Sequence, residues 1–232
     1  MVRTSRHLFA HMPKTGGTWL SSALRPHGRD RVGDGHGSLR SVHTEWVGAR
    51  SFAGTVRNPW DWYVSWWQHC QTGGPTQIQR LKTMGGGSLG FRSVLYGATH
   101  PGRHTWKHPG LLWRVEYPDA LPYLQGEAGG LWSWATRWFY GDGAGSWRAD
   151  VLLDQACLHE GAEALTGFDL DAAPVNARVD RPGQSAMNYA ALYDDEMRGW
   201  VLAADGPLLA ELGYIAPHSP SIHGPVIRLQ AA

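Results

Sequence analysis

The stretch that most constrains this chain lies near its N-terminus, at residues 7–20. A short apolar run from Leu8 to Met12 ends at Pro13, and a lysine, two glycines and two threonines follow before the next apolar residues. This order predicts a buried strand, a tight loop and the start of a helix. We therefore expect a fold in which strands and helices alternate around a sheet.

The predicted loop has the chemistry of an anion site. Gly16 and Gly17 lack a Cβ, so backbone N–H groups there can approach a ligand closely. The first turn of the following helix leaves N–H donors without intrahelical partners and carries the positive end of the helix dipole. Lys14 adds a mobile positive charge. These features predict a pocket for phosphate or sulfate, and the alternative is an ordinary glycine-containing turn between a strand and a helix.

The spacing differs from the phosphate loop of nucleoside triphosphatases, G-x-x-x-x-G-K-[ST]. Here the lysine precedes the glycine pair, and no Lys-Ser or Lys-Thr follows to hold Mg²⁺. The stretch Pro-Lys-Thr-Gly-Gly-Thr at 13–18 instead resembles the 5′-phosphosulfate loop of sulfotransferases, which take sulfuryl groups from 3′-phosphoadenosine 5′-phosphosulfate (PAPS). The resemblance implies that the donor is bound by the residues of this loop and helix start: Pro13, Lys14, Thr15, Gly16, Gly17, Thr18 and Trp19.

A second strand and helix follow the first. Residues 50–57 predict a strand, Asn58 a helix N-cap and Pro59 the first helical position. Arg57 then stands at the carboxyl end of a strand, where ligands collect in parallel α/β sheets, and Ser65 stands two turns along the helix. Taken singly, the arginine is more often a surface ion-pair partner and the serine a surface hydroxyl.

The order of these residues extends the resemblance to sulfotransferases, in which an arginine and a serine eight residues later grip the 3′-phosphate of the donor. An arginine fork and a hydroxyl suit a phosphate that is not transferred and that fixes the register of the donor. The resemblance thus implies that Arg57 and Ser65 bind the 3′-phosphate. Asp61, in the first turn of the same helix, is interpreted as a structural carboxylate favoured by the helix dipole.

The charge and the cysteine content bear on which partners the chain can bind and on whether its compartment is oxidising or reducing. The 232 residues include 21 Lys and Arg against 20 Asp and Glu, a formal net charge of +1. Bulk charge therefore does not favour a nucleic-acid partner, and any anion site must be local. Cys70 and Cys157 stand far apart without metal-binding spacing, so neither a disulfide framework nor a zinc site is expected. A reducing cytosol is the default.

No segment has the sequence of a membrane span. The apolar run from Leu8 to Met12 is broken by His11 and is too short for the hydrophobic region of a signal peptide. No later stretch approaches the ~20 apolar residues that a spanning helix needs. Many sulfotransferases that modify glycans carry a membrane anchor, whereas we expect this chain to be cytoplasmic. Its 13 tryptophans are compatible with surfaces that stack on sugars or rings, although tryptophan more often fills the core.

The middle of the chain is less informative. Glycine-rich segments flank a short helical piece over 73–87, and a helix is predicted over about 88–96. His100, His104 and His108 recur every fourth residue, as on a metal-binding helix face. Prolines and a glycine in the same segment disfavour a helix, and no carboxylate completes a ligand set, so a solvated or substrate-facing loop is the favoured interpretation.

Further elements are predicted on both sides of this region. Residues 38–47 have apolar side chains at helical spacing, with Ser38 as N-cap. Residues 131–140 are apolar nearly all round, which predicts a buried helix or a wall of the acceptor pocket. Residues 150–153 predict a strand, and residues 158–166 predict a helix.

The last third contains a loop with basic residues, a Tyr-Asp helix start and a Gly-Tyr pair. This order resembles the closing segment of bacterial and glycan-type sulfotransferases, and it implies that Arg178 or Arg181 closes over the donor. Cytosolic family members have Arg-Lys-Gly where this chain has proline at position 182 in place of the lysine. Residues 215–232 contain prolines and few charges, so a surface-packed or disordered tail is expected.

The catalytic base must accept a proton near pH 7, which favours histidine or a glutamate with a raised pKa. Similar glycan sulfotransferases use a histidine between the two phosphate motifs, which implies His36 as the base. His43 is the second candidate and is otherwise a packed or capped histidine; Glu45 is the third. Lys14 is the candidate for stabilising charge on the bridging and leaving oxygens.

These features predict an α/β fold with a central parallel sheet flanked by helices, in the P-loop-like topology of sulfotransferases. Residues 1–214 are predicted to form one domain, with 70–150 as a variable acceptor-side insertion. The expected reaction is metal-independent transfer of a sulfuryl group from PAPS to a hydroxyl or amine of a small-molecule or carbohydrate acceptor. Two alternatives stay open: a nucleotide-dependent phosphotransferase on a related fold, and a catalytically silent relative that binds a nucleotide or glycan.

Overall fold

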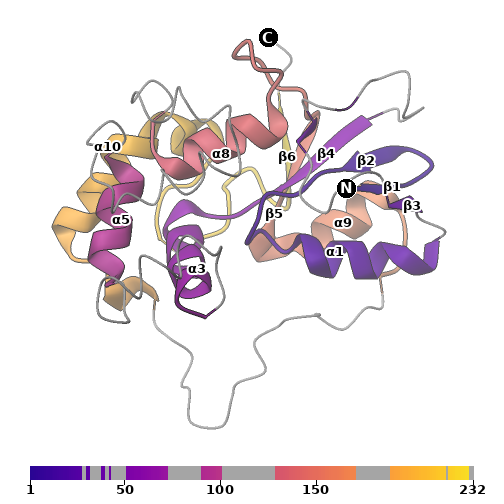
Figure 1. Cartoon of the computed structure of the whole chain (residues 1–232). Helices are drawn as coiled ribbons and strands as arrows, with labels where there is room; N and C mark the ends of the chain where they lie inside the picture. Colours follow the sequence, from indigo (N-terminus) through magenta and orange to yellow (C-terminus); the bar gives the residue numbers. More distant parts are fainter. Residues whose placement is uncertain are drawn as a thin grey trace, which may run out of the picture. The chain divides into compact units, whose positions relative to one another are not determined.

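Parallel strands lie side by side at the centre of a mixed sheet in the computed structural model (Figure 1). They are β2 (His7–Phe9), β4 (Ser51–Val56) and β5 (Val151–Asp154). Leu8 pairs with Phe52, and Gly54 pairs with Leu152. The strands are buried over most of their length, as expected for parallel strands that are covered on both faces.

Antiparallel strands extend this centre on both sides. They are β1 (Val2–Arg3), β3 (Asp30–Arg31) and β6 (Val226–Arg228). Within the described residues the six strands follow the order β3-β1-β2-β4-β5-β6. The predicted α/β class is therefore confirmed, while the sheet is parallel only at its centre and mixed as a whole.

The structure describes residues 1–27, 30–31, 38–39, 42, 51–72, 90–100, 129–170, 189–217 and 219–229. The chain divides into two compact units. The first unit contains the sheet and comprises Met1–Asn58, Thr136–Met187 and Leu212–Ala232. The second comprises Pro59–Ala135 and Asn188–Glu211.

The described helices match several predicted ones. Those of the first unit are α1 (Gly17–Leu24), α9 (Leu158–Thr166) and the short 3₁₀ turns η1 (Arg25–His27) and η3 (Gln155–Cys157). Those of the second unit are α3 (Pro59–Thr72), α5 (Phe91–Thr99), η4 (Tyr189–Leu192) and α10 (Asp195–Glu211). Helix α8 (Leu131–Tyr140) begins in the second unit and ends in the first. The helices predicted at 131–140 and 158–166 are confirmed, as are the helix start predicted after the glycine pair and the start at Pro59.

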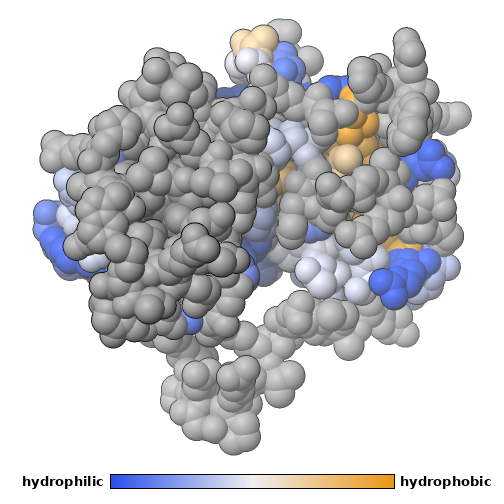
Figure 2. Space-filling view, in the orientation of Figure 1, coloured by the Kyte–Doolittle hydropathy of each residue, from blue (hydrophilic) through white to orange (hydrophobic). Residues whose placement is uncertain are grey.

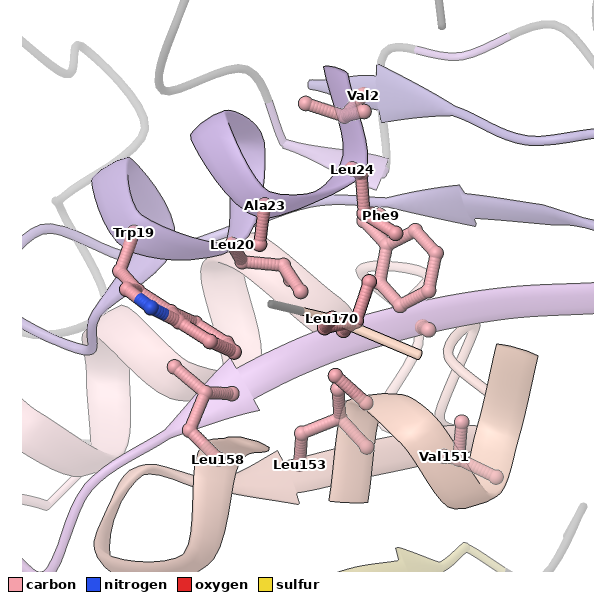
Figure 3. Close-up of a cluster of buried hydrophobic side chains, with 12 residues drawn as sticks. Val2, Phe9, Trp19, Leu20, Ala23, Leu24, Val151, Leu153, Leu158 and Leu170 are labelled. Carbon is pink, nitrogen blue, oxygen red and sulfur yellow. The ribbon is translucent and has the colours of Figure 1, made fainter. Parts of the chain in front are cut away.

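Helices α1 and α9 pack on one face of the sheet (Figure 3). From α1, Leu20, Ala23 and Leu24 contribute buried side chains at the spacing of one helix face. From the strands, Phe9 and Leu153 point into the same cluster. Each large side chain buried here stabilises the fold by about 1.5–3 kcal/mol. This packing holds the start of α1, and the loop before it, at the carboxyl end of β2.

The C-terminal segment differs from the expected tail. Its strand β6 pairs with β5, so that Ile227 lies opposite Leu152 and is buried. Asp154 accepts a hydrogen bond from the Ser221 N–H through Oδ2 at 2.6 Å, which holds the preceding turn against the end of β5. The physical reason is the apolar Val-Ile pair after Pro225, which covers an otherwise open edge of the sheet.

A buried carboxylate joins helices of the second unit. Tyr63 on α3 donates its hydroxyl proton to Asp205 Oδ2 at 2.7 Å, and the Ser133 N–H at the start of α8 donates to Oδ1 at 3.1 Å. The Trp132 N–H donates in turn to the Tyr63 oxygen at 3.2 Å. Asp205 on α10 therefore caps the first turn of α8 from another helix. Asp195 and Glu196, in the first turn of α10, are exposed, and Figure 2 shows hydrophilic surface on the side of the molecule where this helix lies.

The stability of the second unit should depend on the charge of Asp205. Burial raises the pKa of this carboxyl well above its usual range, to about 6. Between about pH 4 and about pH 6 the folded state holds a proton that the unfolded state releases, so the contribution of Asp205 to stability is largest below this range and is lost as pH rises through 6. The difference between the folded and unfolded pKa values corresponds to about 3 kcal/mol in the free energy of unfolding. Of this, about 1 kcal/mol is lost between about pH 5 and about pH 7.

Urea unfolding of the wild type and of Asp205→Asn at these two pH values measures this contribution, since the amide keeps the shape but does not titrate. The difference between the two proteins removes the contributions of other titrating groups. An equal pH dependence in both proteins would contradict the assignment.

Candidate active site

The loop between β2 and α1 has an unusual backbone. Lys14 has φ +71° and is the only non-glycine residue with positive φ in the described part of the chain. Gly16 has φ +84° and ψ 6°, so left-handed residues stand on both sides of Thr15. Alternation of this kind turns successive N–H groups toward a common concave side, which is the geometry of backbone anion sites.

The start of α1 is not capped by a side chain. Gly16 is the N-cap residue and makes no side-chain hydrogen bond, and the first helical bond runs from the Leu20 N–H to the Gly16 carbonyl at 3.1 Å. The N–H groups of the first turn therefore have neither an intrahelical acceptor nor the usual capping oxygen. An anion held by this loop would supply that acceptor and would meet the positive end of the helix dipole.

The two glycines are also required by the protein around them. A Cβ on Gly17 would lie 2.0 Å from His11 Cγ, and a Cβ on Gly16 would lie 2.6 Å from Leu158 Cδ2. Close approach of a ligand is the reason for these glycines that the sequence predicts. The structure adds a second reason, because α9 and the His11 ring occupy the space where the side chains would stand.

The other predicted residues of this loop have distinct surroundings. The Thr15 side chain is fully buried, and its hydroxyl lies 2.6 Å from the Met12 carbonyl and 2.7 Å from Thr55 Oγ1. Trp19 points into the core cluster toward Leu158, so it offers only its backbone to the loop (Figure 3). Thr18 is exposed, whereas Pro13 and Lys14 are half-buried.

Arg57 lies at the same edge of the sheet as the loop. It follows the last residue of β4, and β4 runs parallel to β2 in the first unit, so both strands end on the same side. The residue is half-buried, with Nε shielded from solvent. Its predicted partner Ser65 is half-buried on α3, which belongs to the second unit.

Asn58 has a role that the sequence did not predict. Its side-chain amide donates to the carbonyls of Ala216 and Ser219, at 2.8 and 3.0 Å. Both acceptors belong to the C-terminal segment of the first unit, and Asn58 itself is buried. These two hydrogen bonds fix the position of Asn58, and they therefore restrict the adjacent backbone of Arg57.

Several predicted residues lie outside the described part of the chain. They are the candidate bases His36, His43 and Glu45, the late arginines Arg178 and Arg181, and His104 and His108. His100, the first of the spaced histidines, stacks on Tyr96 with ring centroids 4.1 Å apart. Among the described residues, no group of three or more His, Cys, Asp or Glu side chains gathers closely enough to hold a metal ion.

Two buried residues that the sequence analysis did not single out lie near the loop. Asp154 ends β5 and accepts hydrogen bonds from the N–H groups of Ala156 and Ser221. Tyr140 ends α8, and its hydroxyl accepts a hydrogen bond from the Met12 N–H at 2.8 Å. Asp154 could have been recognised from the sequence as a carboxylate at the end of the apolar Val-Leu-Leu-Asp strand, whereas no local pattern marks Tyr140.

Comparison with protein-family models, with curated proteins and with solved structures finds no match to this chain. In the part of the chain that the structure describes, no helix has the length and apolar character needed to cross a membrane.

Proposed function

We propose that this protein is a sulfotransferase that uses PAPS as donor and has the P-loop-like topology of that family. The observation that carries the proposal is the loop before α1, where left-handed Lys14 and Gly16 lead into a helix start without a side-chain cap. Such a loop suits a tetrahedral anion. The presence of Arg57 at the same edge of the sheet supports a second phosphate contact, as the order of the two motifs predicts.

Each proposed contact follows from donor chemistry. The backbone N–H groups of residues 15–18 would hold the 5′-phosphosulfate, and Lys14 would place its ammonium by the oxygens that become more negative. Arg57 would hold the 3′-phosphate, with a bidentate arginine fork fixing its orientation, and the family resemblance implies Ser65 as a further contact. Arg178 or Arg181 would close over the donor. These assignments extend the family resemblance to this chain residue by residue.

Sulfuryl transfer requires that the acceptor lose one proton and that the sulfuryl group move from the donor to the acceptor. Bound PAPS supplies the sulfuryl group, whose bond to the 5′-phosphate oxygen breaks as a bond to the acceptor oxygen or nitrogen forms. A base near pH 7 takes the proton of the acceptor, and His36, His43 and Glu45 are the candidates. Lys14 stabilises the charge left on the phosphate oxygen, so no metal ion is required by this scheme.

A phosphotransferase is the second candidate, and Asp154 bears on it. A Mg²⁺-dependent enzyme of a P-loop fold uses a carboxylate at the end of a strand beside the phosphate loop. Asp154 ends a central strand, but its two oxygens accept hydrogen bonds from the Ala156 and Ser221 N–H groups at 3.1 and 2.6 Å. The carboxylate is thus used in holding the C-terminal segment, which favours sulfuryl transfer over a kinase-like reaction.

Product release from the donor tests the proposal. Release of 3′-phosphoadenosine 5′-phosphate (PAP) from PAPS is followed without added metal, across a panel of sugar, phenol and amine acceptors. A parallel series with ATP and Mg²⁺ follows release of ADP. We expect acceptor-dependent formation of PAP and none of ADP. ADP formation alone would favour the phosphotransferase, and nucleotide binding without turnover of either donor would favour the silent relative.

A further inference from the structure

The Tyr140 hydroxyl lies at the point where the loop leaves the sheet. It accepts hydrogen bonds from the Met12 N–H at 2.8 Å and from the Thr55 N–H at 3.3 Å, and it donates to the Thr55 carbonyl at 2.5 Å. One phenol oxygen therefore joins the last residue before Pro13 to Thr55, next to the carboxyl end of β4. Tyr140 is fully buried, and all of these residues belong to the first unit.

The register of the strands shows what this hydroxyl replaces. The Ala10 N–H donates to the Ala53 carbonyl at 2.9 Å, which continues the parallel pairing of β2 with β4. In a parallel ladder the next bond of this kind is two residues further on each strand, from Met12 to Thr55. Instead, the Met12 N–H donates to Tyr140 and Tyr140 donates to the Thr55 carbonyl. The phenol oxygen is thus inserted into the ladder between two strands.

The surroundings are shaped for this insertion. A Cβ on Gly54 would lie 2.5 Å from Tyr140 Cε1, so only glycine at that position of β4 leaves room for the ring. Thr136, one turn earlier on α8, donates its hydroxyl toward the Met12 sulfur at 3.9 Å. Thr15 and Thr55 meet through their hydroxyls at 2.7 Å. The loop is therefore attached to β4 twice, through the phenol before Lys14 and through a pair of threonines after it.

We infer that Tyr140 is the positioning residue of the anion loop: by inserting its hydroxyl between Met12 and Thr55 it determines where the chain leaves the sheet, and hence where Lys14 and the following N–H groups point. This inference rests on the proposed function for the identity of the anion. Tyr140 itself acts through the backbone and has no role in bond making. Burial raises its pKa to about 12, so the hydroxyl keeps the proton that it donates to Thr55.

Removal of one oxygen tests this role. Tyr140→Phe keeps the ring against Gly54 but leaves the Met12 N–H without its acceptor. The matched control is Tyr63→Phe, which removes another buried phenol oxygen that joins a backbone N–H to an acceptor, here in the second unit. Both variants should unfold more readily than the wild type. We expect Tyr140→Phe to bind PAP about tenfold more weakly, and Tyr63→Phe to bind it within about twofold of the wild type.

Hydrogen exchange of the peptide that spans residues 11–20 gives a readout without nucleotide. We expect faster exchange there in Tyr140→Phe and unchanged exchange in Tyr63→Phe. Equal PAP affinity and equal exchange in the two variants would overturn the inference. If the wild type binds no PAP, the proposed function fails, while exchange of this peptide still decides whether Tyr140 positions the loop.

Discussion

Replacing Lys14 with alanine should lower the rate of sulfuryl transfer by about a hundred- to a thousandfold, while the protein stays folded. The ammonium is the only side-chain charge of the loop itself, which runs from Pro13 to Gly17. Loss of one donor that stabilises developing charge in an active site has an effect of about this size. The measurement is single-turnover release of PAP from PAPS with an acceptor found in the screen.

The positive φ of Lys14 offers a control for the backbone. Lys14→Gly removes the same charge but suits φ +71°, whereas Lys14→Ala keeps a Cβ in a strained conformation. We expect the two variants to lose the same activity and the glycine variant to be more stable, by about 1 kcal/mol. Lys14→Arg should retain part of the activity. If Lys14→Gly turned over at the wild-type rate, the charge would have no role and the assignment would be wrong.

Replacing Gly17 with alanine should displace the start of α1 and with it the loop. The added Cβ would lie 2.0 Å from His11 Cγ, inside the van der Waals contact distance, so the start of α1 or the buried His11 ring must move. We expect stability to fall by about 1–3 kcal/mol and PAP affinity to fall at least about tenfold. Thermal unfolding and calorimetric titration measure the two effects on the same protein.

Gly199 supplies the matched control for this substitution. It lies in α10, where a Cβ would meet nothing within 4 Å, so Gly199→Ala should stabilise the protein by about 0.5–1 kcal/mol and leave PAP affinity unchanged. The double variant His11→Gly with Gly17→Ala removes both the His11 ring and the His11 Cβ, which the new methyl group would otherwise meet at 2.0–2.5 Å. It should recover PAP affinity relative to Gly17→Ala alone. No recovery would mean that the steric account of Gly17 is mistaken.

Elements set by adjacent residues could be predicted from the sequence. Helix α3 begins at Pro59 because proline fits the first helical position, and α1 begins just after Gly16 because the apolar pattern resumes there. Helix α8 was predicted as buried because it is apolar nearly all round. The loop and Arg57 were also placed correctly at strand ends, since each directly follows an apolar run.

Features that join distant parts of the chain could not be predicted. Tyr140 reaches Met12 across 128 residues, and Asp154 reaches Ser221 across 67. Neither contact leaves a local pattern, because any buried polar group needs some partner and the sequence does not say which. The pairing of β6 was missed for the same reason: a three-residue apolar segment after several prolines has too little length to show a period.

Calorimetric titration of PAP into the wild type and into Arg57→Ala, without added metal, tests whether the protein binds the donor nucleotide and whether Arg57 holds its 3′-phosphate. We expect the wild type to bind PAP in the micromolar range and the variant to bind it at least about tenfold more weakly, because the arginine fork would hold the 3′-phosphate. Adenosine 5′-phosphate, which lacks that phosphate, should bind both proteins weakly and alike. Absence of PAP binding, or binding only of ATP with Mg²⁺, would contradict the account and favour the phosphotransferase.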